Sequence, residues 1–409
     1  MEKHPILLYN AQLVLSDRVA ACGWLLLADG QIKAMGEGRP ADGDLAGYAG
    51  SSIRRFNLDR LLVTPGFIDM HTHGAGGADF MDGTLAAWQT ITRTHACHGT
   101  TTLLATTLTS TSDELNQTMQ IWREWQGIKP DGPADRRGST VLGLHLEGPY
   151  FSMEQRGAQD PRYLHAPDPA EYRPLIENNP GIRRWSAAPE LPGALEFGDY
   201  AASRGILVSM AHTDALYEEV LAAIKHGYSL VTHLYSAMSS VRRIDGLRHG
   251  GVIESGLLLD DLDVEIIADG RHLPPELLQL IVHCKGRGKT ALITDSMRAA
   301  GQDVQESLLG SLRDGQPVII RDGVARLPDG SALAGSVATG DRLVRTMHQM
   351  AGFSLPDAVA MATETPARIL GLKQQKGTLA VGRDADLAIL SDDLQVRQTW
   401  IGGEMIYSR

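Results

Sequence analysis

The sequence predicts an α/β protein in which a (β/α)8 TIM barrel carries a small β-sandwich domain built from both chain termini. Eight short apolar runs recur through the middle of the chain, and helix-length polar connections separate most of them. Nearly every run ends on a residue that can bind a metal ion or move a proton. Because a closed barrel of parallel βα units places its chemistry at the C-terminal ends of its strands, the same order predicts an active site.

Length and composition define the class of protein. The 409 residues suit a barrel of about 250 residues with a further unit of about 100. We expect residues 1–62 to form the first part of the sandwich, 63–372 the barrel, and 373–409 the second part of the sandwich. No apolar run approaches the roughly 20 residues that a membrane span needs, so no membrane role is expected. The N-terminus lacks a secretory cleavage pattern, and the cytoplasm is the expected location.

Charge and cysteine usage exclude further classes. A net charge of -11 argues against a nucleic-acid partner, because phosphate binding needs a concentrated basic face. Three basic pairs are expected to be solvated loop charges: Arg136-Arg137, Arg183-Arg184 and Arg242-Arg243. Three cysteines are too far apart for a thiolate cluster and too few for a disulfide framework. We expect them to be buried thiols: Cys22, Cys97 and Cys284.

The two ends of the chain have the pattern of antiparallel β-structure. Apolar runs at 24–27 and 32–36 flank Asp29-Gly30, which is a strong hairpin signal. Near the C-terminus, runs at 396–401 and 404–407 flank Gly402-Gly403 in the same way. Because two-stranded pieces alone are marginally stable, we expect the two ends to pair in one small β-sandwich.

The barrel elements follow from apolar runs and from periodicity. Strands are expected at 61–70, 101–108, 141–146, 184–189, 207–211, 230–232, 264–268 and 291–294. Apolar spacing of period 3.6 predicts helices at 113–125 and 218–226, and Pro274-Pro275 marks a helix N-terminus. After the eighth strand, two more helices are expected at 341–350 and 355–370.

The first strand ends at His71-Thr72-His73, just before the flexible stretch 74–77. Residues two apart in an extended chain point to the same side, so both imidazoles can face one cation. The alternative is a pair of exposed histidines that bind nothing. The position at the end of an apolar strand favours a ligand pair.

Further donors end the later strands. Glu147 ends the third strand, where a carboxylate can bridge two cations, although it could also be an exposed turn residue. His212 and His233 end two more strands. Either histidine alone would more often be a hydrogen-bonding residue, but together with Glu147 they complete a metal-ligand set.

Asp295 ends the eighth strand. A divalent cation lowers the pKa of water that it binds, so a nearby carboxylate can accept the proton and return it to a leaving amine. The alternative role is a helix cap. We expect Asp295 to be the general base and acid.

These residues, in this order, resemble those of the amidohydrolase superfamily. Within it, the chain is similar to the N-acetylglucosamine-6-phosphate deacetylase family over about Pro65 to Leu390. The stretches that carry the similarity are PGFIDMHTHGAGGADFMDG, GLHLEGPYFS, RGAQDP, SAAPE, AHTDA, THLYSAM, IADGRHL, LITDSM, LAGS and GTLAVGRDADLAIL. The HLEGP, THLY and ADGRH elements together are the most specific of these.

The resemblance implies hydrolysis of the acetamide of N-acetyl-D-glucosamine 6-phosphate to D-glucosamine 6-phosphate and acetate, in amino-sugar catabolism. It implies one or two Zn2+ or Fe2+ ions per subunit. Glu147, His212 and His233 would hold one ion, and the residues available to a second are His71, His73 and Asp295. It also implies a homodimer, in which an arginine can reach the phosphate across the interface. The implied substrate contacts are Ala158, Ser236, Ala237, Arg248 and His272.

Two departures from the family pattern lie in the region that would recognise the sugar. Ser236 stands where the family commonly has Asn, and residues 242–248 resemble an insertion. An N-acetylgalactosamine-6-phosphate deacetylase therefore stays an alternative. A non-catalytic scaffold is a second alternative, against which the intact ligand set argues. A third is an amidohydrolase acting on a ring amide or nucleobase, against which the HLEGP and THLY elements argue.

Overall fold

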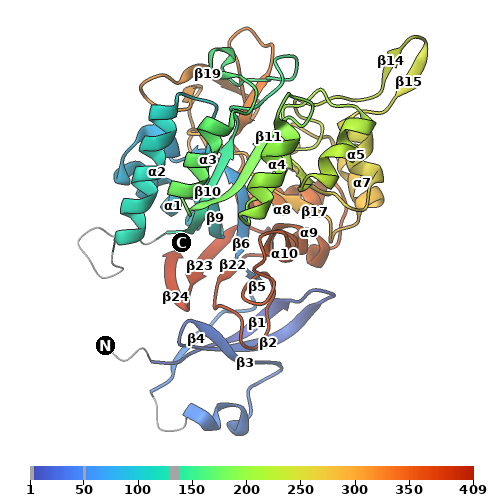
Figure 1. The fold of residues 1–409 in the computed structure, drawn as a ribbon. Helices are drawn as coiled ribbons and strands as arrows, with labels where there is room; N and C mark the ends of the chain where they lie inside the picture. Colours follow the sequence, from blue (N-terminus) through green and yellow to red (C-terminus); the bar gives the residue numbers. More distant parts are fainter. Residues whose placement is uncertain (1–3, 49–51, 129–137) are drawn as a thin grey trace.

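A computed structural model describes residues 4–48, 52–128 and 138–409, so the Arg136-Arg137 pair lies outside the described residues. The protein is a mixed α/β structure in which a large α/β unit stands on a smaller β-sheet (Figure 1). No helix in the described ranges is long and apolar enough to span a membrane.

The large unit is built on a curled sheet of eight parallel strands, as the sequence predicts. In spatial order the strands are β6 (Phe67–Thr72), β9 (Thr100–Thr107), β10 (Thr140–Glu147), β11 (Ile182–Ala187), β12 (Leu207–Met210), β13 (Tyr228–Val231), β16 (Asp263–Ile266) and β17 (Thr290–Leu292). The sheet curls until its first and last strands meet at their C-terminal ends. There Thr72 bridges to Ser296, and the Asp295 N–H donates to the His71 carbonyl at 2.9 Å.

Helices follow most of these strands and cover the outside of the sheet (Figure 1). They are α1 (Leu85–Cys97), α2 (Ser112–Gly127), α3 (Pro169–Asn178), α4 (Ala194–Ser203), α5 (Tyr217–Lys225), α6 (Val252–Leu258), α7 (Pro275–Lys285), α8 (Gly340–Arg345), α9 (Leu355–Ala362) and α10 (Glu364–Ile369). Helix α2 shows why they form: the Thr111 side chain caps the Glu114 N–H, and Leu115, Met119 and Trp125 turn one apolar face inward.

Two of the expected helices differ from the prediction. The single helix expected at 355–370 is two helices, α9 and α10, which break at Thr363. Pro366 contributes to the break because it has no N–H to continue the helical bonding. The helix expected at 341–350 is helical throughout but changes type. Helix α8 ends at Arg345, and a π-helical segment, Thr346–Met350, continues it.

The small sheet takes strands from both ends of the chain, as the sequence predicts. Its order is β24 (Glu404–Ser408), β23 (Val396–Ile401), β22 (Leu387–Leu390), β5 (Leu62–Pro65), β1 (Ile6–Val14), β2 (Val19–Ala28) and β3 (Gln31–Glu37), with β4 (Arg54–Asn57) beside β1. Leu8, Leu25, Val63 and Trp400 share its core. Hydrogen bonds join all eight strands in one sheet, so the two-layer sandwich stays a prediction.

The strand expected at 61–70 is wrong as a single element. It is two strands, β5 in the small sheet and β6 in the large one, and Gly66 lies between them. The Gly66 N–H donates to the Asp386 carbonyl at 2.8 Å. A Cβ atom at Gly66 would collide with the Thr101 side chain of β9, so glycine lets the two sheets share this short connection.

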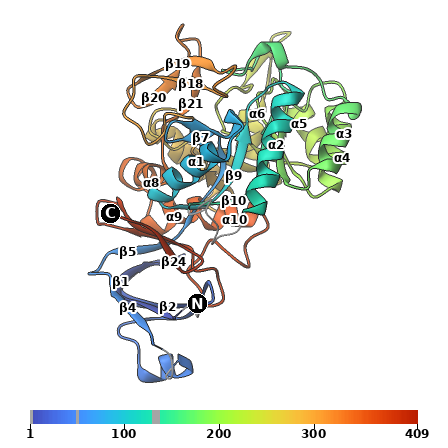
Figure 2. The ribbon, with the colours of Figure 1, turned by 90° about the vertical axis from the view of Figure 1, so that its left-hand side faces the viewer.

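A four-stranded antiparallel sheet between β17 and α8 was not predicted. It comprises β18 (Glu306–Leu309), β19 (Gln316–Arg321), β20 (Val324–Arg326) and β21 (Leu333–Ser336). It lies at the end of the large unit opposite the small sheet (Figure 2). The remaining short elements are β7 (Gly74–Ala75), β8 (Ala78–Asp79), the projecting hairpin of β14 (Arg242–Ile244) and β15 (Leu247–His249), and three 3-10 helices at Asp42–Tyr48, Phe80–Asp82 and Pro161–Tyr163.

Arg184 corrects the expectation that the basic pairs are solvated loop charges. It lies on β11 and is fully buried, while Arg183 beside it is exposed, because successive side chains of a strand point to opposite faces. Arg184 pairs with the buried Glu265 of β16 and donates to the Thr232 hydroxyl at 2.8 Å and the Ser209 hydroxyl at 3.1 Å. The interior of the curled sheet therefore contains a satisfied ion pair.

The expectation of buried cysteines is also wrong. Cys22 and Cys284 are exposed, and Cys97 is half-buried. Cys22 lies on an outward-facing stretch of β2, and Cys284 lies near the exposed end of α7. All three are free thiols.

Glu265→Gln tests the contribution of the buried ion pair. The substitution leaves the Arg184 charge buried without its partner, so the free energy of unfolding should fall by about 3–5 kcal/mol in urea denaturation. Glu37→Gln is the control, because the Arg18–Glu37 pair is 55% exposed on both sides and should contribute at most about 1 kcal/mol. Equal losses in the two variants would contradict this account.

Candidate active site

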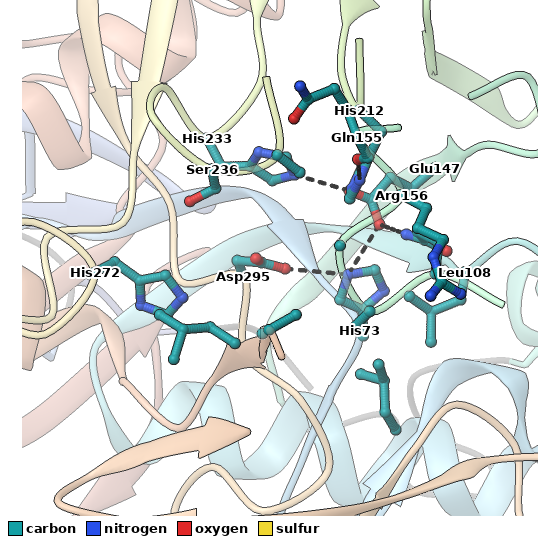
Figure 3. A pocket seen from close by; sticks show the side chains of 18 of the residues that line it. His73, Leu108, Glu147, Gln155, Arg156, His212, His233, Ser236, His272 and Asp295 are labelled. Carbon is teal, nitrogen blue, oxygen red and sulfur yellow. Dashed lines mark hydrogen bonds and ion pairs between the residues drawn. The ribbon is translucent and has the colours of Figure 1, made fainter. Parts of the chain in front are cut away.

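The six predicted metal and catalytic residues converge at one end of the parallel strands. His71 lies on β6 and His73 directly follows that strand, while Glu147 ends β10. His212, His233 and Asp295 lie in the turns after β12, β13 and β17. They surround the floor of a cavity of about 520 Å3 (Figure 3). His71 lies beneath this floor and is fully buried, whereas the other five line the cavity.

Backbone conformation directs three of these side chains inward. His212, His233 and Asp295 all have positive φ angles, of 45°, 29° and 45°. Such angles cost a non-glycine residue about 1–3 kcal/mol each, and they persist only where the surroundings hold them. The His212 ring donates from Nδ1 to the Gln155 carbonyl at 3.0 Å, and the Asp295 N–H donates to the His71 carbonyl. Strain at three separate strand ends is typical of a functional site.

One group of donors is Glu147, His212 and His233. Glu147 Oε1 lies 3.1 Å from His233 Nε2 and 3.3 Å from His212 Nε2. Tetrahedral zinc ligands at about 2.1 Å from the metal are about 3.4 Å from one another. The observed separations fit such a cation, and two imidazoles with one carboxylate are donors that Zn2+ and Fe2+ accept.

A second group is His71, His73 and Glu147. The Nε2 atoms of the two histidines are 3.2 Å apart, and His73 Nε2 is 3.4 Å from Glu147 Oε2. Asp295 Oδ1 lies 3.1 Å from His73 Nε2 and 3.4 Å from His71 Nε2. Glu147 Oε1 is also 3.4 Å from His71 Nε2, so Glu147 is within reach of both groups, through Oε1 to His71, His212 and His233 and through Oε2 to His73. A carboxylate shared in this way can bridge two cations.

Electrostatics keep both carboxyl groups ionised. Burial alone would raise the pKa of Glu147, but the imidazoles of His71, His212 and His233 hold that pKa well below its usual value. Burial acts in the same way on Asp295, and His71 and His73 lower its pKa. Although burial opposes it, the contacts with Asp295 and Glu147 raise the pKa of His73 to about 9. A protonated His73 therefore balances the carboxylates, and a divalent cation could take over this role.

His145 supports the site from below. Its ring meets the His71 ring edge-on, with centroids 4.6 Å apart, and its Nε2 lies 2.7 Å from the Ser186 hydroxyl. Burial and the Arg184 charge hold the pKa of His145 well below its usual value, so the ring is neutral. The hydrogen-bonded interior of the curled sheet thus reaches the metal-ligand candidates directly.

The substrate contacts implied by the resemblance divide into two groups. Four of them line the cavity: Ala158, Ser236, Ala237 and His272. The His272 ring is oriented by Asp269, whose Oδ2 accepts from Nδ1 at 2.9 Å. Arg248 does not line the cavity, because it lies exposed on β15 of the projecting hairpin.

Sequence reasoning missed several residues of the cavity wall. Arg156 and Gln159 lie in the loop after β10, and Leu309 and Leu333 come from the unpredicted β18–β21 sheet. The RGAQDP stretch drew attention to this loop, but a single sequence gives no sign of which of its side chains turn inward. The inserted sheet was missed because its short strands lack a clear apolar alternation.

Comparison with known proteins agrees with this geometry. Residues 62–406 match the amidohydrolase family. N-acetylglucosamine-6-phosphate deacetylase of Bacillus subtilis is 33% identical over 98% of this chain and 97% of its own length. N-acetylgalactosamine-6-phosphate deacetylase of Escherichia coli O157:H7 is 32% identical over 90% of this chain and 93% of its own length.

A solved structure shares the fold as well. A variant of N-acetyl-D-glucosamine-6-phosphate deacetylase from Mycobacterium smegmatis, in complex with N-acetyl-D-glucosamine 6-phosphate, superposes with a TM-score of 0.86 at 29% identity. The match covers 99% of this chain and 100% of that one. The curled parallel sheet and the small sheet therefore belong to one shared architecture.

His212→Ala tests the first donor group. Removing one of its two imidazoles should lower the amount of zinc that stays with the protein after dialysis, measured by elemental analysis. His226→Ala is a matched control, because His226 is a half-exposed histidine that pairs with Asp199 away from the cavity. Equal zinc content in wild type and His212→Ala would count against the ligand assignment.

Proposed function

The chain belongs to the amidohydrolase family, and we propose that it hydrolyses the acetamide of N-acetyl-D-glucosamine 6-phosphate to D-glucosamine 6-phosphate and acetate. The observation that carries the proposal is the placement of Asp295 beside a shared histidine–carboxylate cluster at the floor of a cavity of sugar size. Relatives of this name, similar over nearly the full chain, support the choice of substrate.

The site supports a metal-assisted acyl transfer with Zn2+ or Fe2+, and its two donor groups suit one or two ions per subunit. When bound, the cation polarises the acetyl carbonyl and lowers the pKa of the attacking water. Asp295 is ionised, so it can accept the proton of that water. The same carboxyl then returns the proton to the amide nitrogen as the C–N bond breaks. His272, held by Asp269, binds the sugar, and Ala158, Ser236 and Ala237 shape the wall beside it.

Arg156 is the best placed residue of this subunit to bind the 6-phosphate. It lies on the cavity wall, and its guanidinium makes no ion pair within the described part of the chain (Figure 3). The backbone of its loop is fixed, because the Arg156 carbonyl accepts from the Gln159 N–H at 2.9 Å and the Gln155 carbonyl accepts from His212. A free guanidinium on a fixed loop suits a phosphate, which it can bind with two parallel hydrogen bonds.

Arg248 would act from a second copy of the chain. The β14–β15 hairpin stands clear of the large unit (Figure 1), and Leu247 at its turn is 69% exposed. Burying that apolar tip against another subunit would stabilise a homodimer and would carry Arg248 toward the partner cavity. Sedimentation of the purified chain as a monomer would contradict this part of the proposal.

Three further assignments accompany this function. We propose that the curled sheet is a closed (β/α)8 barrel of residues 63–372, since Thr72 and Ser296 join its edges. Segments 1–62 and 373–409 would then form a small β-sandwich domain. A cytoplasmic location suits a phosphorylated sugar, because its charge keeps it from crossing a membrane unaided.

The alternative substrate, N-acetylgalactosamine 6-phosphate, has less support among the relatives, although one of them carries that name. The two sugars differ only in the configuration of one hydroxyl, so the same catalytic residues would serve both. Ser236 lies on the cavity wall, where such a difference is read. The converging donor groups argue against a non-catalytic scaffold.

Acetate release from a panel of sugars tests the proposal directly. Turnover should be fastest with N-acetyl-D-glucosamine 6-phosphate, slower with the galactosamine epimer, and slowest with the two unphosphorylated sugars. Arg156→Ala should raise KM for the phosphorylated sugars about 10–100-fold, because a charged hydrogen bond contributes about 1.5–3 kcal/mol. In the same variant, KM for unphosphorylated N-acetylglucosamine should not change. Arg204 lies outside the cavity, so the control variant Arg204→Ala should keep the wild-type KM for both kinds of sugar. A metal-loaded protein that released no acetate from any of the four sugars would refute the proposal.

Asp295→Asn tests the proton transfer. The amide keeps the shape of the side chain but cannot accept a proton, so kcat should fall by at least about 100-fold. Circular dichroism and the zinc bound through Glu147, His212 and His233 should be retained. Activity close to wild type would remove Asp295 from the mechanism.

A further inference from the structure

Gln159 touches the carboxylate on which both donor groups depend. It lies in the loop after β10 and is only 5% exposed, yet it forms part of the cavity wall. Its Nε2 donates to Glu147 Oε2 at 2.7 Å. Its Oε1 accepts from the Thr109 N–H, just after β9, at 3.0 Å. The side-chain amide thus spans two neighbouring strand ends and the centre of the site.

The orientation of this amide is fixed by its partners. A backbone N–H can only donate, so the Gln159 atom facing Thr109 must be the carbonyl oxygen. The other end is then the NH2 group, and it faces Glu147 Oε2 at 2.7 Å. A flipped amide would place two donors together at one end and two acceptors together at the other.

This bond restricts how Glu147 can turn. Oε1 is the oxygen close to His71, His212 and His233, and Oε2 is the one held by Gln159 and faced by His73. A carboxylate free to rotate would exchange or tilt its two oxygens. The bond from Gln159 holds Oε2 on the His73 side and leaves Oε1 free for the histidines on its side, which include His212 and His233.

We propose that Gln159 is a positioning residue that orients the Glu147 carboxylate, so that Oε1 faces His212 and His233, Oε2 faces His73, and divalent cations bind tightly. The proposal rests on the metal-dependent function proposed above. Residues of this kind form a hydrogen bond to a metal ligand and do not touch the metal. Their removal commonly lowers metal affinity about 10–100-fold.

Other contacts already hold the loop in place. The Ser152 N–H donates to the His212 carbonyl at 2.9 Å, the Gln155 side chain donates to Asp214 at 2.9 Å, and the Gln316 side chain donates to the Ala158 carbonyl at 2.9 Å. The loop should therefore keep its conformation without the Gln159 side chain. Its bond to Glu147 has no substitute among these contacts.

Zinc titration of the metal-free protein, with a competing chelator dye, tests the proposal without any substrate. Gln159→Leu keeps the bulk of the side chain but removes its donor, and the dissociation constant for the first zinc should rise about 10–100-fold. Gln316→Leu is the matched control, because it also removes one side-chain amide bond to this loop but does not touch Glu147. Its zinc affinity should equal that of wild type.

Circular dichroism and urea denaturation of the metal-free variants separate positioning from folding. Should Gln159→Leu fail to fold, Gln159→Met removes the same donor with a more adaptable side chain, and the same loss of affinity is expected. Wild-type zinc affinity in either folded variant, or an equal loss in Gln316→Leu, would overturn the proposal while leaving the deacetylase function standing. Failure of the wild-type protein to bind either Zn2+ or Fe2+ would overturn both.

Discussion

The structure depends on one buried carboxylate that is shared by several imidazoles. Glu147 is 2% exposed, and an isolated carboxylate at such a place would be strongly destabilising. His212 and His233 face one of its oxygens, and His73 and Gln159 face the other. Each of these partners comes from a different strand end or loop, so the chain can satisfy Glu147 only when the parallel sheet curls until its edges meet.

The rest of the molecule holds this arrangement in place. The Arg184–Glu265 pair places hydrogen-bonded charge in the interior of the curled sheet, and His145 connects that interior to His71. Hydrogen bonds hold His212 and Asp295, two of the three strand-end residues with positive φ angles. The β18–β21 sheet contributes apolar wall to the same opening. Stability and function are therefore coupled, because the contacts that close the sheet also set the distances between the metal ligands.

Much of the site could be predicted because its residues follow strands, and the ends of parallel strands gather at one side of the sheet in this fold. Once His71, His212 and Asp295 are each placed at the end of a parallel strand, the fold brings them to the same opening whatever the loops do. The eight strands could be found for a similar reason, since each lies in a short segment rich in apolar and β-branched residues.

The remaining features depend on long-range contacts that a local pattern does not contain. Gly66 divides an apparently continuous run because Thr101 of β9 packs against it. Arg184 points inward because of strand register, which a basic pair does not reveal. Arg156 and Gln159 belong to a loop whose path is set by contacts with His212, Glu147 and Thr109. Arg248 is likewise exposed because it lies on a hairpin, whereas the sequence indicated only an insertion at residues 242–248.

Anomalous diffraction at the zinc edge, from crystals grown with zinc, tests the central claim most directly. The account predicts a strong peak bounded by Glu147 Oε1, His212 Nε2 and His233 Nε2, at about 2.0–2.2 Å from each. A zinc-loaded, active protein whose anomalous peak lay away from these three atoms would contradict it.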